Sequence, residues 1–397
     1  MFTKAYIPYG GYYSSPFARW QGTLANENGI ELAAATSKRW LAEKKIDVGI
    51  FEYLFFGFTI PQNHGFYASP WAAAMMGAER IPGCIISQAC STSTTCVYQA
   101  ALGIEMGEYT KVFTLMADRC SNGPHLAWPN PKGPGGQLET ENWLMDNFGN
   151  DPWAKNAMIE TAENVAKEGN ITRQECDDLA LRRFEQYQAA LDNDRAFQKR
   201  YMFPVELQAG KRKTVIFGED EGVAPTTAEG LAGLRPVLPG GVHTFGSQTH
   251  PADGNCGLIV TDRTTAKELS REAGVEIQVL SYGFYRDRKG YMAAAVVPAA
   301  QRALEKAGIG IKEVKAIKTH NPFAVNDLYF AKQLGIDAHA FNNYGSSLVF
   351  GHPQGPTAGR CMIEMIEELA MNGGGYGLFA GCAAGDTAAA MVLKVTC

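Results

Sequence analysis

The sequence has no paired-cysteine motif, although it contains nine cysteines. They are scattered without a C-x-x-C pair, and an odd, irregular set makes both a disulfide framework and a zinc site poor explanations. We therefore expect reduced thiols in a cytoplasmic protein, no bound metal, and a catalytic role for any cysteine that has a function.

Long apolar runs and clusters of positive charge are also missing. No apolar stretch reaches the ~20 residues of a membrane span, and the opening MFTKAYIPYGGYY lacks the basic region and apolar core of a secretory signal. The net charge is −5 at pH 7, without a run of Lys or Arg. This charge balance argues against a nucleic-acid partner. We expect neither membrane nor nucleic acid to be involved.

What the chain does have is the length and composition of a tightly folded enzyme. Its 397 residues are 46% hydrophobic and 19% charged, which suggests two or three domains or a duplicated one. Apolar runs alternate with helical patterns before residue 118 and after 244, as in sheets covered by helices. We expect a helix over 29–45, a strand over 314–320 and a hairpin over 376–395. The intervening segment begins with Pro- and Gly-rich residues 121–143, which indicate an ordered loop, and continues with two helices.

The segment ISQACSTS places Cys90 beside hydroxyl residues, directly before a helical pattern. Unpaired N–H groups at a helix start, together with the helix dipole, lower the pKa of a thiol and favour the nucleophilic thiolate. A small cysteine packed beneath a helix is the alternative, and it is the commoner one for a cysteine taken alone.

Three further segments place reactive side chains at the ends of predicted elements. THNPFAVND puts His320 just beyond a strand, GHPQGPTAGR puts His352 in a loop before a helix, and GLFAGCAAGD puts Cys382 at a strand-to-strand turn. Sheet proteins collect their active sites at such ends. The remaining histidines are interpreted as structural: His64, His125, His243, His250 and His339.

Taken in order, these motifs resemble those of the thiolase superfamily over nearly the whole chain. The resemblance extends to SPFARWQGTLA after the first strand and to THPADGN at the return to the core. It implies the five-layered α-β-α-β-α thiolase fold, built from two duplicated α/β halves with an inserted loop domain. The N-terminal half would span 1–118, completed by 245–268. The loop domain would be 119–244 and cover the coenzyme A site, and the C-terminal half would be 269–397.

The resemblance also implies a chemistry. Cys90 would attack an acyl-CoA and hold the acyl group as a thioester, His352 would take the thiol proton, and Cys382 would move a proton at the α-carbon of a second acyl group. The oxyanion donors would be the N–H groups of Cys90 and Ala384 for the acyl-enzyme, and His352 and His320, or a group that His320 holds, for the enolate.

Coenzyme A enters as a substrate, and no other cofactor is implied. The substrate-binding residues would be Thr249, Ser247, Met158 and Phe323.

The chain departs from the commonest thiolase pattern in ways that leave the substrate open. HNPF stands where Asn-Glu-Ala-Phe is usual, CAAG replaces a glycine run, Ala157 stands where many thiolases have His, and Thr249 stands in place of Ser. Such variations resemble the thiolases of anaerobic aromatic degradation, such as benzoylsuccinyl-CoA thiolase, which work beside a small zinc-ribbon/OB-fold subunit. The family forms dimers or tetramers, so we expect at least a dimer.

A group of aromatic residues bears on the acyl group. If some of them line the pocket, a bulky or aromatic acyl group is favoured; the alternative is that they pack in the core and loops. The group comprises Tyr12, Phe17, Trp20, Phe66, Tyr67, Trp128, Trp143 and Phe148.

Two other functions fit parts of the pattern. Cys90, His320 and His352 would also make the Cys-His-His site of a ketoacyl-synthase-like condensing enzyme, but such an enzyme normally has no counterpart of Cys382. A non-catalytic acyl-CoA-binding subunit is the second alternative, and it would have no chemical need for the complete set of four.

Overall fold

The strands of the N-terminal half form one side of a large central sheet. The computed structural model describes residues 1–208, 210 and 213–397. Strand β4 (Tyr53–Gly57) lies between β5 (Gly83–Ile86) and β6 (Lys111–Arg119) and is parallel to both. Strand β6 pairs antiparallel with β11 (Ala252–Thr261), a strand buried along its full length. This half therefore contains a mixed sheet, and β11 enters it from beyond the inserted segment.

The strands of the C-terminal half form the other side. Strand β13 (Val314–His320) runs parallel to β14 (Gly374–Ala383), which forms an antiparallel hairpin with β15 (Thr387–Thr396). Strand β15 then pairs with β12 (Glu276–Arg286). The short β1 (Tyr6–Ile7) pairs with both β12 and β11 and links the two halves into one 11-stranded sheet. The expected strand over 314–320 and the expected hairpin are confirmed.

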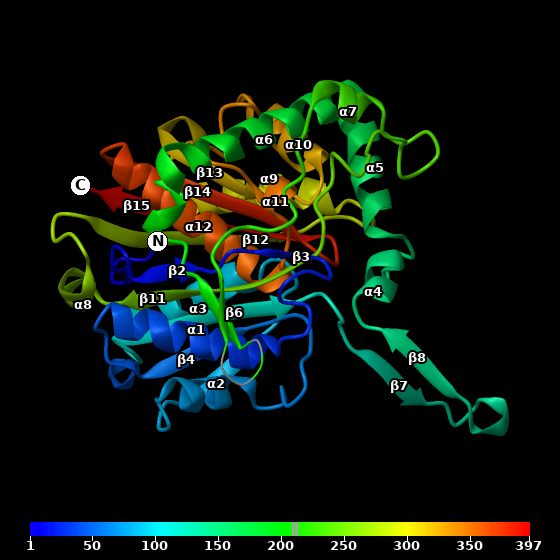
Figure 1. Ribbon diagram of the computed structural model, residues 1–397. Coiled ribbons are helices and arrows are strands. Elements are labelled where there is room, and N and C mark those ends of the chain that lie inside the picture. The colour runs from blue at the N-terminus through cyan, green and yellow to red at the C-terminus, as the bar shows by residue number, and fades with distance from the viewer. Residues whose placement is uncertain (209, 211–212) are drawn as a thin grey trace.

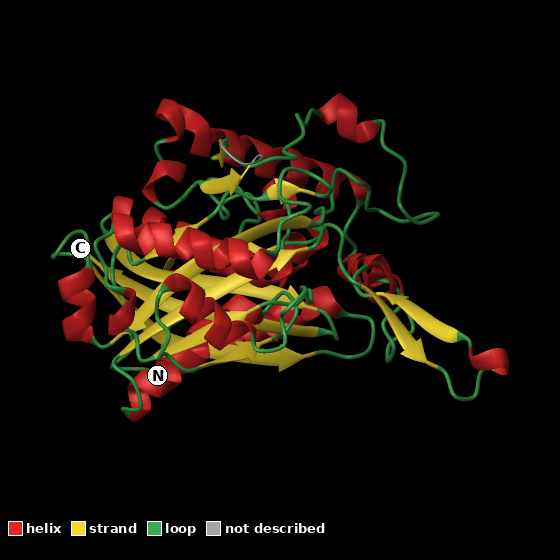
Figure 2. Ribbon diagram, turned by 60° about the horizontal axis from the view of Figure 1, so that its bottom comes forward, coloured by secondary structure: helices red, strands yellow, loops and turns green. Residues whose placement is uncertain are grey.

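Helices cover the sheet in layers, as Figures 1 and 2 show. Helices α3 (Thr92–Met106) and α12 (Gln354–Met371) pack on each other, and α12 contacts strands of both halves. On the outside, α1 (Gly29–Glu43) and α2 (Ala68–Met76) cover the N-terminal half, whereas α9 (Val296–Ala307) covers the C-terminal half. Both α3 and α12 contact strands of the two halves, so the sheet folds around them and contributes two β layers. The predicted five layers, α-β-α-β-α, are therefore present, and the helix expected over 29–45 is confirmed as α1.

Helix α12 is buried along most of its length even though it carries charged residues. Arg360 forms an ion pair with Asp220 at 2.7 Å, and Lys318 forms one with Glu364 at 2.8 Å, all four side chains being fully buried. A buried charge is tolerated when it is paired and hydrogen-bonded. The central helix is thereby fixed through both apolar packing and matched charges.

The start of the inserted segment differs from the expected loop. Residues 125–142 form an antiparallel hairpin of β7 (His125–Pro129) and β8 (Leu138–Asn142), which projects from the body in Figure 1. The prediction of a loop is wrong because most of the Pro and Gly residues mark the turn at 130–136, and the flanking strands lack an alternating apolar pattern. The two predicted helices are present as α5 (Met158–Gly169) and α6 (Arg173–Arg195).

Nine further α-helices and strands complete the fold of the described residues. They are β2 (Tyr12–Ser14), β3 (Ala18–Arg19), α4 (Met145–Gly149), β9 (Val205–Gln208), β10 (Thr214–Phe217), α7 (Ala228–Ala232), α8 (Arg263–Leu269), α10 (Ala324–Leu334) and α11 (Ser347–Phe350). Among the helices of the described residues, none is both long and apolar enough to cross a membrane.

Candidate active site

Cys90 lies in the tight turn between β5 and α3. Ser91 is the N-cap residue of α3, so Cys90 stands at the helix start, as predicted. The turn is closed by hydrogen bonds from the N–H of Ser91 to Gln88 O at 3.0 Å and from the N–H of Thr92 to Ala89 O at 3.1 Å. Ala89 has φ of 45°, in a region that a side chain disfavours. The turn therefore holds the thiol in place with some local strain.

His352 lies in the loop between α11 and α12 and faces the thiol. Its Nε2 is 3.1 Å from Cys90 Sγ, and its Nδ1 is 2.7 Å from Thr357 Oγ1. The hydroxyl of Thr357 donates to Pro353 O at 2.6 Å, so its oxygen is left to accept the proton on Nδ1. The Nε2 atom of His352 consequently carries a lone pair toward Cys90. This is the arrangement of a base beside a nucleophile.

His320 and Cys382 lie at the ends of two neighbouring parallel strands. His320 ends β13 opposite Gly381 of β14, which places Cys382 one residue further along. The rings of His320 and His352 stack with centroids 4.0 Å apart and an interplanar angle of 28°. The Sγ of Cys382 accepts a hydrogen bond from Asn326 Nδ2 at 3.2 Å. Tertiary structure thus brings all four predicted side chains into one region.

By residue type, the site also has the donors of a metal centre. The Sγ of Cys90 and one ring nitrogen each from His320 and His352 lie within 4.8 Å of one another. The two rings are nearly parallel, however, and an imidazole lone pair lies in the plane of its ring. Two stacked rings cannot both direct such lone pairs at a single ion, so we assign these residues no metal.

Burial controls the electrostatics of the site. It raises the pKa of Cys90 to about 12, although the N–H groups of Ala384 and Cys90 itself lower that pKa in part. The expectation that the helix start leaves Cys90 with a low pKa is therefore wrong, because loss of solvent outweighs the helix. Burial also lowers the pKa of His352 well below its usual value and that of His320 to about 3. At neutral pH the thiol and both imidazoles are uncharged.

Cys382 experiences the same burial. Loss of solvent raises its pKa well above the usual value, charge on Cys90 raises it further, and the amide of Asn326 opposes the shift. The thiols of Cys382 and Cys90 are thus electrostatically linked. A negative charge on one disfavours a negative charge on the other.

An apolar cavity of about 350 Å³ opens onto the thiol. Cys90, His352 and Ala384 all contribute to its lining. The walls come from the inserted segment, from the segment at 245–251 that follows it, and from the C-terminal half, and include Phe148, Met158, Ile159, Phe245, Met292 and Phe323. An apolar cavity of this size is typical of a site that binds an apolar ligand.

The predicted substrate-binding residues divide into two groups. Met158, Thr249 and Phe323 line the cavity, as does Ala157. Ser247 does not: its side chain is fully buried and its Oγ accepts a hydrogen bond from the N–H of Thr244 at 2.9 Å. It therefore stabilises the turn beside the cavity.

Only one of the eight aromatic candidates, Phe148, lines the cavity. Trp20 and Trp143 pack beside it around the buried Ile60. The other five lie in the core or at the surface: Tyr12 and Phe17 are buried, and Phe66, Tyr67 and Trp128 are exposed. For most of the group, the core or loop explanation is thus the correct one.

Other site residues were not predicted from the sequence. Phe245 and Met292 line the cavity, Thr357 supports His352, and Asn326 supports Cys382. Thr357 lies five residues after His352 in the first turn of α12, a spacing that offered a usable signal. The others carry no local signal, since their roles depend on contacts between distant segments.

The other histidines stand apart from the thiol. His243 Nδ1 lies 3.0 Å from Glu163 Oε1, and His250 contributes its main-chain oxygen to the N–H of His352 at 2.9 Å. His64, His125 and His339 are exposed.

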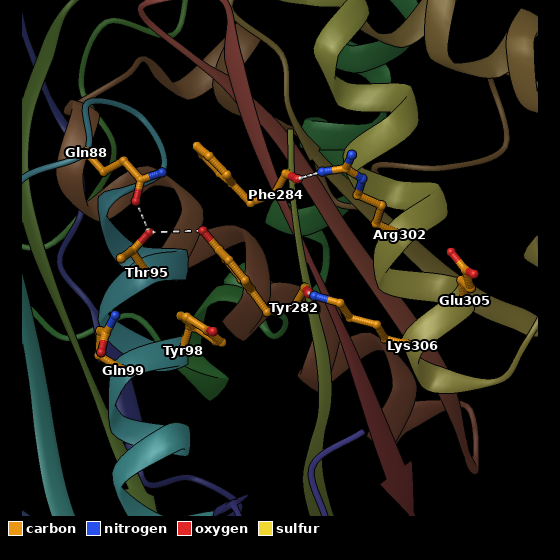
Figure 3. Close-up of a pocket in the computed structure, with 9 residues that line it drawn as sticks. All are labelled: Gln88, Thr95, Tyr98, Gln99, Tyr282, Phe284, Arg302, Glu305 and Lys306. Carbon is orange, nitrogen blue, oxygen red and sulfur yellow. Dashed lines mark hydrogen bonds between the residues drawn. The ribbon is translucent and has the colours of Figure 1, made fainter. Parts of the chain in front are cut away.

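A second, more open depression of about 760 Å³ lies on the outer side of α3 (Figure 3). Tyr98 of α3 stacks on Tyr282 of β12 there, with ring centroids 4.1 Å apart, and Arg302 of α9 donates to Phe284 O at 2.8 Å. The face of α3 that borders it, with Thr95, Tyr98 and Gln99, is only half-buried. Neither Cys90 nor a histidine lines this depression, and it is not the catalytic cavity.

Comparison with known proteins gives a consistent result. The family model "Thiolase, N-terminal domain" matches residues 11–264, and "Thiolase, C-terminal domain" matches residues 277–395. The chain is 28% identical over 389 residues to a probable acetyl-CoA acetyltransferase of Mycobacterium leprae, covering 96% of this chain and 97% of that protein. It is 30% identical over 327 residues to the peroxisomal 3-ketoacyl-CoA thiolase B of Rattus norvegicus, covering 80% and 73%.

Solved structures agree. The acetyl-CoA acetyltransferase of Bacillus anthracis superposes with a TM-score of 0.91 at 25% identity, covering 99% of both chains. The human mitochondrial 3-ketoacyl-CoA thiolase in complex with CoA superposes with a TM-score of 0.89 at 24% identity, covering 99% of this chain and 98% of that one.

Proposed function

The chain belongs to the thiolase family, and we propose that it makes or cleaves a C–C bond of a 3-ketoacyl-CoA through an acyl thioester on Cys90. As a thiolase it is an acyltransferase. The observation that carries the proposal is the 3.1 Å distance between Cys90 Sγ and His352 Nε2 beside an apolar cavity.

The first half-reaction is acyl transfer to Cys90. The thiol proton passes to Nε2 of His352 as Sγ attacks the thioester carbon, and the departing coenzyme A takes that proton from His352. The N–H groups of Ala384 and Cys90 face the sulfur, which supports them as donors to the thioester oxygen. Because both partners are neutral at rest, the attacking thiolate forms only as its proton moves to His352.

The second half-reaction joins or releases the other acyl group. In the condensing direction Cys382 first gives its thiol proton to His352 and then, as the thiolate, takes the α-proton of a second acyl-CoA. The resulting enolate attacks the acyl-enzyme, and the departing Cys90 thiolate takes the proton from His352. The amide of Asn326 donates to Cys382 Sγ, which favours the thiolate that accepts the α-proton. The enolate oxygen would be met by His352, with His320 stacked beside it. A role for Cys382 favours a thiolase over a ketoacyl-synthase-like enzyme.

Coenzyme A would lie along the inserted segment. We propose residues 119–244 as a loop domain that covers it, with 1–118 plus 245–268 and 269–397 as the two halves. Met158 and Thr249, which both line the cavity, would contact the pantetheine arm. Ala157 lines the same cavity and offers no ring nitrogen there. No other cofactor enters the proposed reaction.

The lining of the cavity supports a bulky or aromatic acyl group. Phe148, Phe245 and Phe323 contribute to the walls. Within the described part of the chain, the lining includes no Lys or Arg. The aromatic end of a substrate such as benzoylsuccinyl-CoA would therefore find apolar contacts, but its carboxylate would need a cation from outside this lining. Uncharged aromatic or branched acyl groups fit better.

We propose that the working form is at least a homodimer. In the described residues, β5 is the last strand on its side of the sheet, with Ile85 37% exposed, so a second copy has a free edge to pair with. We also propose a small zinc-ribbon/OB-fold subunit as a partner when the substrate is aromatic. Light scattering during size exclusion, with and without acyl-CoA, would measure the mass of the assembly.

The test is an acylation experiment read by intact mass. The protein is incubated with short, branched and aromatic acyl-CoAs and 3-ketoacyl-CoAs, in parallel with Cys90→Ala and Cys382→Ala. We expect an adduct that requires Cys90 and is released by free CoA, and whose mass identifies the acyl group. Cys382→Ala should still be acylated but should not complete condensation or thiolysis.

Two results would count against the proposal. A Cys382→Ala variant with unchanged turnover would favour the ketoacyl-synthase-like alternative. Absence of an adduct from every thioester would favour a non-catalytic acyl-CoA-binding subunit.

A further inference from the structure

The two nitrogens of His320 have different surroundings. The residue is fully buried, its Nδ1 lies 3.1 Å from Ser347 Oγ, and its Nε2 has no hydrogen-bond partner in the described part of the chain. Nε2 is therefore the ring nitrogen left for a bound substrate. Whether it carries a proton decides whether His320 donates or accepts a hydrogen bond there.

The side-chain amide of Asn321 has a defined orientation. Its Nδ2 donates to the carboxylate of Asp327 at 2.6 Å and to Ser346 Oγ at 3.0 Å. Its Oδ1 accepts from the main-chain N–H of Leu348 at 3.1 Å. A carboxylate cannot donate and an N–H cannot accept, so exchanging the O and N atoms would break both contacts. Asn321 therefore presents an acceptor to Ser347.

Ser347 has one proton and three polar neighbours. Its Oγ accepts from the main-chain N–H of Asn321 at 3.1 Å and donates to Asn321 Oδ1 at 3.0 Å. With its only proton given to Oδ1, the hydroxyl has just a lone pair left for Nδ1 of His320. Turning that proton toward His320 instead would set two lone pairs, on Ser347 Oγ and Asn321 Oδ1, against each other at 3.0 Å. The first arrangement makes one more hydrogen bond.

We propose that Ser347 is a positioning residue that, with Asn321, holds His320 as the Nδ1–H tautomer and leaves Nε2 as a hydrogen-bond acceptor. The role of this tautomer in turnover rests on the proposed function. The assignment of the tautomer rests only on the hydrogen bonds around His320. It opposes the expectation that neutral His320 donates to the enolate oxygen. His320 becomes a donor at Nε2 only after that nitrogen has taken up a proton.

The tautomer can be measured directly by two-bond 15N–1H NMR on the full-length protein labelled with 15N-histidine. The signals of His320 are assigned by their loss in His320→Gln. We expect a protonated Nδ1 and a bare Nε2 in the wild-type protein at pH 7. A protonated Nε2 with a bare Nδ1 would overturn the proposal, whatever the variants do.

Three variants test whether the hydroxyl of Ser347 sets the tautomer of His320. In Ser347→Ala neither ring nitrogen of His320 has a hydrogen-bond partner in the described part of the chain. The preference for Nδ1–H should therefore be lost, and a signal of protonated Nε2 should appear. Ser347→Thr keeps a hydroxyl and should restore the wild-type tautomer. Ser346→Ala is the matched control, because it removes a hydroxyl bound to the other side of Asn321 without touching His320. An unchanged His320 tautomer in Ser347→Ala would also overturn the proposal.

Kinetics give a second readout. For a thioester accepted in the acylation test, Ser347→Ala should lower kcat by about 10-fold with KM little changed, and Ser347→Thr should recover most of that loss. An equal loss in Ser346→Ala would indicate general damage to the loop and contradict a specific role for Ser347. Failure of the acylation test itself would leave the NMR result standing, so the two failures are distinguishable.

Discussion

The loop that carries His352 and the strand end that carries His320 support their rings in different ways. Both rings are buried, and in both the Nδ1 atom meets a hydroxyl. The hydroxyl near His352 comes from Thr357 in the following helical turn, whereas that near His320 comes from Ser347, which is 27 positions away. One ring is thus oriented by its own neighbours in sequence, the other by tertiary structure.

The difference continues at the second nitrogen. Nε2 of His352 faces Cys90, but Nε2 of His320 has no partner in the described residues. The comparison indicates that His352 is assembled for proton transfer in the resting protein. The ring of His320 is oriented by buried hydrogen bonds through Ser347 and Asn321, and its Nε2 is left for a later step of the reaction.

Removing the ring of His352 should have the largest effect on chemistry. His352→Ala leaves Cys90 with a raised pKa and no base, so we expect acylation to slow by about 10²–10⁴-fold. Single-turnover mass spectrometry with an acyl-CoA measures this rate. His125→Gln, at an exposed position on the projecting hairpin, is the control. Acylation of His352→Ala at the wild-type rate would contradict the assignment of His352 as the base.

Breaking the network behind His320 should have the largest effect on stability. Arg183 pairs with Asp327 at 2.9 Å, both side chains being fully buried, and Asp327 holds Asn321 beside His320. Arg183→Met would leave the carboxylate of Asp327 buried and unpaired, which typically costs about 3–5 kcal/mol of unfolding free energy. Urea unfolding measures this loss.

The neighbouring Arg182 provides a matched control for this variant. It pairs with Glu185 at the surface, where an ion pair contributes about 0–1 kcal/mol. Arg182→Met should therefore unfold at nearly the wild-type urea concentration. An equal loss of unfolding free energy in Arg183→Met and Arg182→Met would show that the buried network does not stabilise the His320 region.

The lowered pKa of His320 predicts a specific acid sensitivity. The unfolded chain binds a proton on this residue below its ordinary pKa of about 6.5, whereas the folded protein does so only near a pKa of about 3. The free energy of unfolding therefore falls as the pH drops from 6.5 toward 3. At pH 5 it is lower by about 2 kcal/mol than above pH 6.5.

Between pH 7 and pH 5, the free energy of unfolding of His320→Gln should fall by about 2 kcal/mol less than that of the wild-type protein. Urea unfolding at both pH values gives the comparison, which concerns the difference between them and not the absolute stability of the variant. His339→Gln, at an exposed position, should behave like the wild-type protein. Identical pH dependence in His320→Gln and wild type would contradict a buried neutral His320.

The smallest expected effect comes from the hydroxyl of Thr357. Thr357→Val removes the acceptor for Nδ1–H of His352, so we expect acylation to slow by about 10-fold. Thr357→Ser keeps the hydroxyl and should react at nearly the wild-type rate. Comparing Thr357→Val with Ser347→Ala in the acylation step separates the two histidines, because only the first should slow this step. Equal slowing would show that the two rings act as one unit.

Much of the site was recognisable in the sequence because its main residues lie at the ends of regular elements. Strand β13 ends at His320, α3 begins two residues after Cys90, and Cys382 lies near the turn of the final hairpin. Periodicity locates such ends, and the residue types suggest the chemistry. The projecting hairpin was missed because β7 and β8 are mostly exposed and lack the alternating apolar pattern that marks a half-buried strand.

The sequence by itself determined the alternation of strands and helices outside the inserted segment, the reactive residues Cys90, His320, His352 and Cys382, and the resemblance to thiolases, since these depend on local pattern and residue type. Only the tertiary structure decided the distances among them, the burial that raises the pKa of Cys90, and the hydroxyls of Ser347 and Thr357 that support the two rings. The physical reason is that desolvation and hydrogen-bond direction arise from what surrounds a side chain. For this site, those surroundings come from segments far apart in the sequence.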